Sequence, residues 1–271
     1  MKRPLLISSL TKSFPTPTGP HVAVKDFDVR IEPGEFVSLL GHSGCGKSTV
    51  LSIIAGLQNS TTGGIVIDGK EINGPSLDRA LVFQSPSLLP WMTALENVML
   101  AVSQAHPSMA RSTQREFAMN YLDVVGVAEY AAQLPAELSQ GTQQRVAIAR
   151  AYSLEPRFLL LDEPFGALDS ITRYELQDLL LDLWEQDPKT VIMVTHDVDE
   201  ALHLCDRIIV MTDGPEAHLG LDLRVTLPRP RSRTAAVENP EYFRLRRQVI
   251  QFLEDHSRQF ANQRAPVEQL A

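Results

Sequence analysis

The chain has 271 residues, of which 44% are hydrophobic, enough for the core of one domain or of two closely packed subdomains. Its 33 acidic and 25 basic side chains give a formal net charge of -8, which disfavours broad nucleic-acid binding because no basic excess displaces counterions from phosphates. The 2 cysteines form neither a disulfide framework nor a metal-ligand spacing, and no apolar run approaches the ~20 residues of a membrane helix, so we expect a soluble protein from a reducing compartment.

The first third of the chain is predicted to consist mainly of strands and turns. Apolar residues between positions 22 and 31 are spaced as in strands, and the Pro33-Gly34 turn leads into the apolar run 36–40. After a glycine-rich loop, the apolar residues of 48–57 fall on one helical face. The segment GGIVIDGKEI then alternates as a hairpin whose turn is Asp68-Gly69.

The middle of the chain changes to helices from residue 85 to about residue 157. Apolar spacing indicates one helix from Leu95 to Val102 and another from Phe117 to Val125. Strands return at 158–162, 191–195 and 208–211, with a helical stretch at 174–184. This alternation predicts an α/β fold in which helices cover both faces of a sheet.

The C-terminal part begins with a Pro- and Arg-rich segment, LPRPRSRT at residues 227–234, which is predicted to be a linker. Residues 239–260 have the apolar spacing of an amphipathic helix. We expect its arginines (Arg244, Arg246 and Arg247) to form a solvated face, with contact to a membrane surface or a partner as the alternative.

A glycine-rich loop, GHSGCGKST, follows the apolar strand 36–40 and matches the pattern G-x-x-x-x-G-K-[ST]. Glycines let backbone N–H groups converge on an anion, and the following helix directs its positive end at the same place. Lys47 is expected to reach the β- and γ-phosphates of a nucleotide, Ser48 to ligate Mg²⁺, and Cys45 to act as a small filler. The strand before the loop and the helix after it disfavour a chance match. The predicted phosphate-binding residues are Gly41, His42, Ser43, Gly44, Cys45, Gly46, Lys47, Ser48 and Thr49.

Two carboxylates end the buried strand in FLLLDEP, at the sheet edge where α/β proteins bind ligands. We expect Asp162 to hold Mg²⁺, directly or through water, and Glu163 to polarise an attacking water as general base. An Asp-Glu pair is more often a helix cap or a surface pair. The glycine-rich loop makes the functional interpretation the stronger one, and together the two motifs predict a nucleoside triphosphatase.

The stretch LSQGTQQRVAIARA, residues 138–151, resembles the signature of the ATP-binding subunits of ABC transporters, which is normally LSGGQ. Ser139 and Gly141 match the signature, while Gln140 and Thr142 depart from it. The serine hydroxyl and one glycine remain at the start of a helix suited to a γ-phosphate. The substitutions at Gln140 and Thr142 would affect how tightly the signature contacts the γ-phosphate, but they leave the resemblance to the family intact.

Further positions match the same family in order. The resemblance implies that Gln84, in LVFQSP, contacts the metal and the attacking water, and that His196, in VTHD, contacts the γ-phosphate. Asp169, in the sequence Ala-Leu-Asp, lies in the loop that crosses the dimer interface in this family. Phe14, in LTKSF, matches the aromatic residue that stacks on adenine, although a phenylalanine near a first strand is ordinarily a core residue.

The resemblance implies a P-loop nucleoside triphosphatase core, with a mixed central sheet, flanking helices and an antiparallel β subdomain, and an inserted α-helical subdomain. We expect residues 5–84 to form the first part of the nucleotide-binding core and 85–157 the helical subdomain. Residues 158–214 would form the second part of the core, and 215–271 a C-terminal extension that either regulates the cycle or merely packs.

The resemblance also implies partners and a mechanism. Two ATP-binding subunits, identical or paralogous, would face each other head to tail, with Mg²⁺ and ATP between the glycine-rich loop of one and the signature of the other. Hydrolysis would open the pair and drive transmembrane permease subunits, placing this chain peripherally at the cytoplasmic face of the inner membrane. Leu88, Leu89, Pro90 and Trp91 would dock a permease, or else belong to the core of the helical subdomain.

A narrower resemblance concerns the transported solute. EPFGALDSITR, THDVDEAL and TDGPEAHLG resemble importers of small anions, most nearly those of nitrate, with sulfonate, taurine, cyanate and bicarbonate as further candidates. Such systems use an extracytoplasmic solute-binding protein, which this subunit would meet only indirectly.

Two other classes of protein share parts of this pattern. A non-transport ABC ATPase acting on DNA or the ribosome would carry a long coiled coil, zinc cysteines or tandem cassettes, none of which the sequence contains. A P-loop kinase for small molecules would leave the LSQGT stretch, Gln84 and His196 unexplained. We therefore predict an ATP hydrolase coupled to transport, with no nucleic-acid partner.

Overall fold

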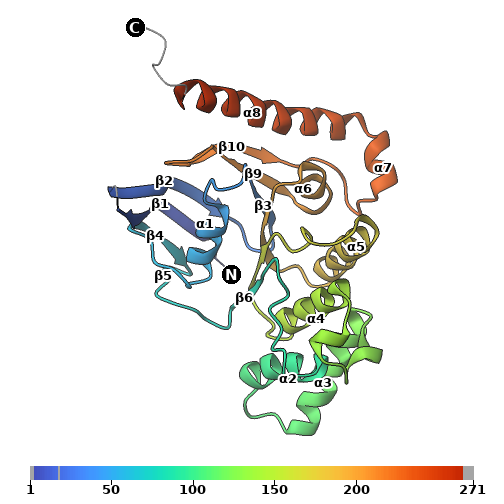
Figure 1. Ribbon diagram of the computed structural model, residues 1–271. Helices are drawn as coiled ribbons and strands as arrows, with labels where there is room; N and C mark the ends of the chain where they lie inside the picture. The colour runs from blue at the N-terminus through green and yellow to red at the C-terminus, as the bar shows by residue number, and fades with distance from the viewer. Residues whose placement is uncertain (1–2, 18, 265–271) are drawn as a thin grey trace, which may run out of the picture. The chain divides into compact units, whose positions relative to one another are not determined.

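The computed structural model describes residues 3–17 and 19–264 and divides the chain into two compact units, which are considered separately (Figure 1). The first unit comprises Met1–Asn73 and Val194–Ala271, and the second Gly74–Met193. The division of the sequence at residues 84, 157 and 214 follows motifs rather than contacts and stays a prediction. Among the described residues, no helix has the length and apolar composition required to cross a bilayer.

The first unit contains strands and helices from both of its chain segments. Its elements are β1 (Leu5–Thr16), β2 (Gly19–Ile31), β3 (Phe36–Leu40), α1 (Lys47–Ile54), β4 (Thr62–Ile67), β5 (Lys70–Glu71), α6 (Val198–Leu204), β9 (Arg207–Met211), β10 (Leu219–Arg224), α7 (Arg233–Glu238) and α8 (Pro240–Arg264).

An antiparallel sheet in the order β2-β1-β4-β5 forms one layer of this unit. Asp68 and Gly69 both have positive φ, 55° and 79°, as the tight turn between β4 and β5 requires, so the hairpin prediction is confirmed. The second layer contains β3, whose five residues are all buried and which pairs in parallel with β9. A strand covered on both faces is mostly apolar, as is the sequence FVSLL, in which Ser38 is the one polar residue.

The second unit is mainly helical. Its elements are β6 (Arg79–Val82), α2 (Ala94–Ala105), α3 (Arg111–Val124), η1 (Ala128–Tyr130), η2 (Pro135–Glu137), α4 (Gln140–Tyr152), β7 (Phe158–Asp162), α5 (Ser170–Gln186) and β8 (Thr190–Thr195), whose last two residues belong to the first unit.

Polar side chains cap the starts of α2, α4 and α5 in the second unit. Thr93 and Glu96 form a capping box at the start of α2, Ser139 caps α4 and Asp169 caps α5. β6 and β7 pair in parallel, so the chain enters the helical segment from one sheet strand and returns along its neighbour. Two residues with predicted functions, Ser139 and Asp169, therefore also determine local structure.

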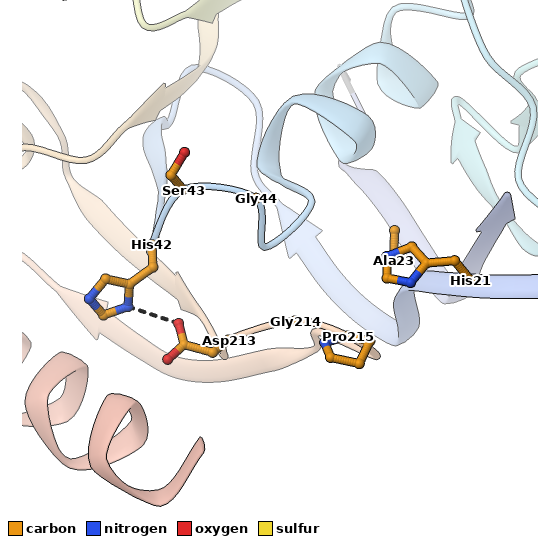
Figure 2. Close-up of a pocket in the computed structure, with 8 residues that line it drawn as sticks. All are labelled: His21, Ala23, His42, Ser43, Gly44, Asp213, Gly214 and Pro215. Carbon is orange, nitrogen blue, oxygen red and sulfur yellow. Dashed lines mark hydrogen bonds and ion pairs between the residues drawn. The ribbon is translucent and has the colours of Figure 1, made fainter. Parts of the chain in front are cut away.

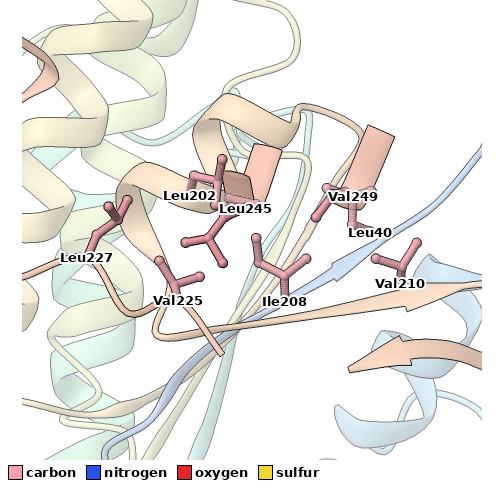
Figure 3. Close-up of a cluster of buried hydrophobic side chains, with 9 residues drawn as sticks. Leu40, Leu202, Ile208, Val210, Val225, Leu227, Leu245 and Val249 are labelled. Carbon is pink, nitrogen blue, oxygen red and sulfur yellow. The ribbon is translucent and has the colours of Figure 1, made fainter. Parts of the chain in front are cut away.

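Helix α8 packs on the outside of the first unit rather than extending into solvent (Figure 3). Leu245 and Val249 are fully buried against residues of β3, α6 and β9, which include Leu40, Leu202 and Ile208. Of the helix's arginines, Arg244 pairs with Glu241 on the same helix at 2.7 Å. Arg246 pairs with Asp199 of α6 at 2.7 Å, so part of the predicted solvated face makes a specific contact within the unit.

The segment 227–234, predicted to be a linker, is held in place over most of its length. Arg231, only 4% exposed in its side chain, donates to the carbonyl oxygens of Leu202, His203 and Cys205 at the end of α6. Arg229 donates to Asp206 at 2.8 Å. Arginine fits this place because its planar fork satisfies several carbonyls at a helix C-terminus simultaneously. Residues 227–232 form neither helix nor strand, as expected of a linker, and their arginines attach this segment to the end of α6.

Replacing Leu245 tests whether α8 is part of the core of the first unit. Leu245→Ala removes a fully buried side chain from the cluster, and we expect the free energy of unfolding to fall by about 2–5 kcal/mol. Phe243→Ala, at a position 51% exposed on the same helix, should cost less than about 1 kcal/mol. Chemical denaturation followed by circular dichroism measures both, and similar small losses would contradict the packing role.

Candidate functional site

The glycine-rich loop connects β3 to α1, and its backbone is one that only glycine adopts readily. Gly41, Gly44 and Gly46 have φ of 155°, 82° and 97°. An added Cβ at Gly46 would lie 2.6 Å from a methyl carbon of Val24, whereas at Gly44 it would meet no atom within 4 Å. The loop thus packs closely on β2 at one glycine and turns another toward open space, where a phosphate could approach the backbone.

Lys47 is the first residue of α1 and lies folded across the loop. Its Nζ donates to the carbonyl oxygens of Gly41 and His42, both at 2.8 Å, although the residue is only 5% exposed. The Cys45 thiol is buried beneath Lys47. Burial raises the pKa of this thiol above its ordinary value, although the positive charge of Lys47 acts to lower it. Cys45 therefore acts as the predicted small filler and not as a reactive thiolate.

A hollow of about 380 Å³ lies beside the loop (Figure 2). His42, Ser43 and Gly44 line it from the loop side. The opposite walls come from β2, through His21 and Ala23, and from the segment after β9, through Asp213, Gly214 and Pro215. The last five residues were not among the predicted site residues, because the lining of a hollow depends on how distant segments meet.

Phe14 and His196 also belong to the first unit. Phe14 is half-buried on β1, pairs in register with His21 of β2, and has Lys12 Nζ 5.1 Å from its ring centroid. Since its strand neighbour His21 lines the hollow, Phe14 lies close to that wall without being one of the residues that form it. His196 is exposed between β8 and α6, and Asp197 caps α6 by accepting from the backbone of Asp199 and Glu200.

In the second unit, Gln84 and Glu163 are brought together although 79 positions separate them in the sequence. An added Cβ at Gly166 would lie 3.3 Å from Gln84 Nε2 and 3.6 Å from Glu163 Oε2, so both side chains converge over this glycine. Asp162 ends β7, and Glu163 has a φ of 45°, uncommon for a residue with a side chain. Residues with such backbone conformations are enriched at functional sites, although Asp68 and other turn residues of this chain share the positive φ.

Ser139, Gly141 and Asp169 meet at the starts of α4 and α5. Thr172 links them: its methyl group would lie 2.5 Å from a Cβ at Gly141, and its backbone N–H donates to Asp169 at 3.1 Å. The hydroxyl and backbone N–H of Thr172 hold the pKa of Asp169 below its ordinary value. Thr172 carries no motif of its own, so sequence reasoning passed over it.

The signature helix is also tied to the segment that carries Gln84. Gln144, 1% exposed, donates from Nε2 to the backbone carbonyl of Phe83 at 3.2 Å. Ser139 Oγ accepts from the Thr142 backbone N–H at 3.1 Å and lies 2.8 Å from the Thr142 hydroxyl. The departure at Thr142 therefore gives the signature serine a new hydrogen-bond partner.

These residues fit a magnesium-bound triphosphate in their chemistry. In the first unit the loop offers glycines, backbone N–H groups and a lysine to phosphate, and Ser48 offers a hydroxyl oxygen of the kind Mg²⁺ accepts. In the second unit Asp162 and Gln84 each offer an oxygen donor of that kind. The described residues contain no cluster of three or more His, Cys, Asp or Glu side chains that could enclose a metal. Mg²⁺ commonly takes one or two protein oxygens and completes its shell with water and phosphate oxygens, which agrees with this sparse donor set.

Comparison with known proteins places these features in context. Residues 24–166 match the family described as ABC transporter. The chain is 50% identical over 242 residues, 89% of its own length and 88% of the relative's, to the nitrate import ATP-binding protein NrtD of Synechococcus elongatus. It is 46% identical over 249 residues to the bicarbonate transport ATP-binding protein CmpD of the same species, covering 92% of this chain and 90% of that one.

A solved structure shows the same fold. The dimeric, post-hydrolysis form of the ATP-binding cassette MJ0796, bound to ADP and Pi, superimposes with a TM-score of 0.74 at 36% identity. The match covers 83% of this chain and all of that one. The predicted α/β nucleoside triphosphatase fold is therefore confirmed, whereas the roles of the individual site residues stay predictions.

Two glycine substitutions in the loop test its packing against β2. Gly44→Ala and Gly46→Ala both force alanine into a left-handed backbone, but only Gly46→Ala also collides with Val24. Without nucleotide, we expect Gly46→Ala to lower the free energy of unfolding by about 1–3 kcal/mol more than Gly44→Ala does. Thermal unfolding measures the difference, and equal losses would show that the approach to Val24 carries no constraint.

Proposed function

Because this chain belongs to the ATP-binding subunits of the ABC transporter family, we propose that it binds and hydrolyses ATP to drive the import of a small inorganic anion, with nitrate as the first candidate. The observation that carries the proposal is the 50% identity to a nitrate import ATP-binding protein over nearly the full length of both chains. The convergence of Gln84 and Glu163 and the shape of the phosphate loop support the hydrolytic part.

In this proposal the phosphate loop captures the triphosphate. The backbone N–H groups of 41–49 and the N-terminus of α1 face the phosphates, and Lys47 exchanges its two carbonyl partners for phosphate oxygens. Ser48, Asp162 and Gln84 would be the ligands of Mg²⁺, and the ion would supply charge neutralisation to the phosphate oxygens. Phe14 stacks on the adenine ring, and His196 donates to the γ-phosphate.

Glu163 is proposed as the general base. A carboxylate held next to an amide side chain can orient a water through two contacts, one from Glu163 and one from Gln84. The water's oxygen attacks the γ-phosphorus, the bond to the bridging oxygen breaks, and Glu163 accepts the proton that the water loses. The products are ADP and inorganic phosphate.

A second ATP-binding subunit is proposed to complete the site, since one chain offers a triphosphate only part of the donors that the charge requires. Ser139 and Gly141 of the second subunit would supply N–H and hydroxyl donors at the start of its α4. Asp169, exposed at the start of α5, would lie in the loop that crosses to the other subunit. Loss of the γ-phosphate then removes the group that holds the pair closed.

The permease is proposed to dock at the loop before α2. Trp91 is 70% exposed, an unusual position for so large an apolar side chain. The loop is nevertheless rigid, because the fully buried Asn97 donates to the carbonyls of Leu89, Met92 and Thr93 and accepts from Leu89 N–H at 2.8 Å. A preorganised aromatic side chain on the surface is characteristic of a binding hot spot. Docking there would place the chain peripherally on the cytoplasmic face of the membrane.

The solute is proposed by similarity, since this subunit would not contact it. Nitrate and bicarbonate are both small, planar, singly charged anions, and both are transported by systems whose ATP-binding subunits resemble this chain. An extracytoplasmic binding protein would select between them. Competition by bicarbonate, taurine or cyanate in the uptake assay below decides which anion the assembled system carries.

Glu163→Gln tests the function. The variant keeps the size and polarity of the side chain but loses the base, so ATP turnover should fall about 10²-fold or more while ATP binding is retained. In vesicles carrying the permease subunits and supplied with binding protein, the wild-type chain should drive ATP-dependent nitrate uptake and the variant should not.

The matched control is Glu116→Gln, at an exposed position on α3, which should leave ATP turnover unchanged. Near-normal hydrolysis by the Glu163 variant would refute the assignment of the base. ATP-dependent uptake of another anion, with no uptake of nitrate, would refute the choice of solute and leave the ATPase assignment standing.

Trp91→Ala tests the docking surface. We expect recovery of the permease with the purified chain to fall at least about tenfold, while the dissociation constant for ATP stays within about twofold. Phe243→Ala, which also removes an exposed aromatic side chain, is the control and should not affect recovery of the permease. Equal losses of ATP binding and assembly would count against a docking role.

A further inference from the structure

Three side chains from distant parts of the sequence meet on the outer flank of the phosphate loop. His42 Nδ1 lies 2.8 Å from Asp213 Oδ1, and Ser257, near the end of the described part of α8, donates to Asp213 Oδ2 at 3.3 Å. Ser257 Oγ also lies 3.4 Å from Nδ1 and 3.3 Å from Nε2 of His42. The C-terminal helix therefore touches the loop that is proposed to hold the triphosphate.

The segment that carries Asp213 is itself fixed between β2 and the loop. Its backbone pairs with β2 through three hydrogen bonds, Lys25 N–H to Ala217, Glu216 N–H to Val22 and Ala217 N–H to Ala23. A Cβ at Gly214 would lie 3.5 Å from the carbonyl oxygen of Gly44. Asp213 is only 12% exposed in its side chain, so its carboxylate has a defined position from which to hold His42.

Helix α8 is anchored firmly enough to transmit a constraint. Leu245 and Val249 are buried in the core of the unit, and Phe252 packs directly on Gly220 of β10, where a side chain would collide with its ring. Phe252 and His256 are in ring contact with centroids 4.1 Å apart, and Ser257 follows. The helix makes a second contact through Arg246, which pairs with Asp199, and Asp199 is three residues after His196 in the sequence.

The order Ser257, His42, Asp213 repeats the residue types of a hydrolytic triad, but the geometry differs from one. Ser257 Oγ lies almost equally far from both ring nitrogens, so it is not aligned with either lone pair as an activated nucleophile would be. It also donates to the carboxylate directly. The cluster is suited to holding the imidazole in place and not to activating the serine.

We propose that Asp213 and Ser257 are positioning residues for the phosphate loop, through which helix α8 sets the affinity for a nucleoside triphosphate from outside its binding site. His42 is the link, because its backbone carbonyl is one of the two acceptors of Lys47 Nζ. Fixing its side chain fixes that carbonyl, and with it the place from which Lys47 moves to the phosphates. This inference rests on the proposed nucleotide binding and extends it to the C-terminal helix.

The test measures nucleotide affinity and turnover in the full-length chain. Asp213→Ala should weaken binding of a fluorescent ATP analogue about threefold to tenfold, and Ser257→Ala about twofold to threefold, as expected for lost hydrogen bonds. KM for ATP should rise in parallel while kcat stays within about twofold, because a loop held less firmly weakens ground-state and transition-state binding alike. Amide hydrogen exchange should accelerate at residues 42–47 in both variants.

Two further variants make the test specific. Ser257→Thr restores the hydroxyl and should recover most of the lost affinity, whereas Arg244→Ala, which breaks an exposed ion pair on the same helix, should leave affinity and exchange unchanged. If Asp213→Ala fails to fold, the pair Ser257→Ala and Ser257→Thr still decides the question. Wild-type affinity in the Asp213 and Ser257 variants would overturn the inference, whereas a wild-type chain that binds no ATP would instead refute the proposed function.

Discussion

The arrangement of the first unit depends on the close approach of the phosphate loop to β2. Gly46 lies so near Val24 that no side chain fits between them, and its left-handed backbone leads directly into α1. That contact fixes where the helix begins and therefore where Lys47 and Ser48 lie. The segment after β9 pairs with β2 at Val22, Ala23 and Lys25, so one edge strand supports both the loop and the wall facing it.

Helical N-termini provide a second organising theme, in the other unit. Ser139 and Asp169 each satisfy the orphan N–H groups of a helix and each belong to a motif with a proposed role in the nucleotide cycle. In the proposed cycle the same oxygen atoms would contribute to folding and to function. A substitution at either position would then change local stability and nucleotide chemistry together, so the two effects have to be separated by measuring unfolding and turnover on the same variant.

Much of the fold could be predicted because the chain's motifs are local. The strand 158–162, the hairpin around Asp68-Gly69 and the amphipathic C-terminal helix follow from periodicity, and the structure confirms them. Strands β6 and β10 were among those not predicted: β6 is short, and β10 (LGLDLR) has intermediate or exposed residues throughout. The contacts of segment 227–234 could not be predicted, because its arginines gain their partners only when the end of α6 lies beside them.

The residues of the candidate site likewise fall into two groups: those that a local motif predicts and those that depend on contacts between distant segments. The residues of the phosphate loop, Asp162 and Glu163 could be proposed from spacing, since a single strand-loop-helix passage carries each group. Thr172, Gly166, Asp213 and Ser257 could not, because their importance arises from contacts between segments that are 31 positions (Gly141 to Thr172) to 215 positions (His42 to Ser257) apart in the sequence. Such residues belong to ordinary types and stand in ordinary contexts, and only the packing of one segment on another reveals them.

The contact between the Ser139 and Thr142 hydroxyl groups at the start of α4 bears on where the serine proton is donated. A hydroxyl group has one proton and two lone pairs, and the Thr142 amide already occupies one lone pair of Ser139. When the Thr142 hydroxyl donates into the other, the serine proton is left for an arriving oxyanion. When donation runs the opposite way, that proton is consumed inside the first turn of the helix. The side chain of residue 142 thereby affects whether the Ser139 hydroxyl can donate its proton to an arriving anion or has already donated it to Thr142. The path of the backbone is the same in both cases.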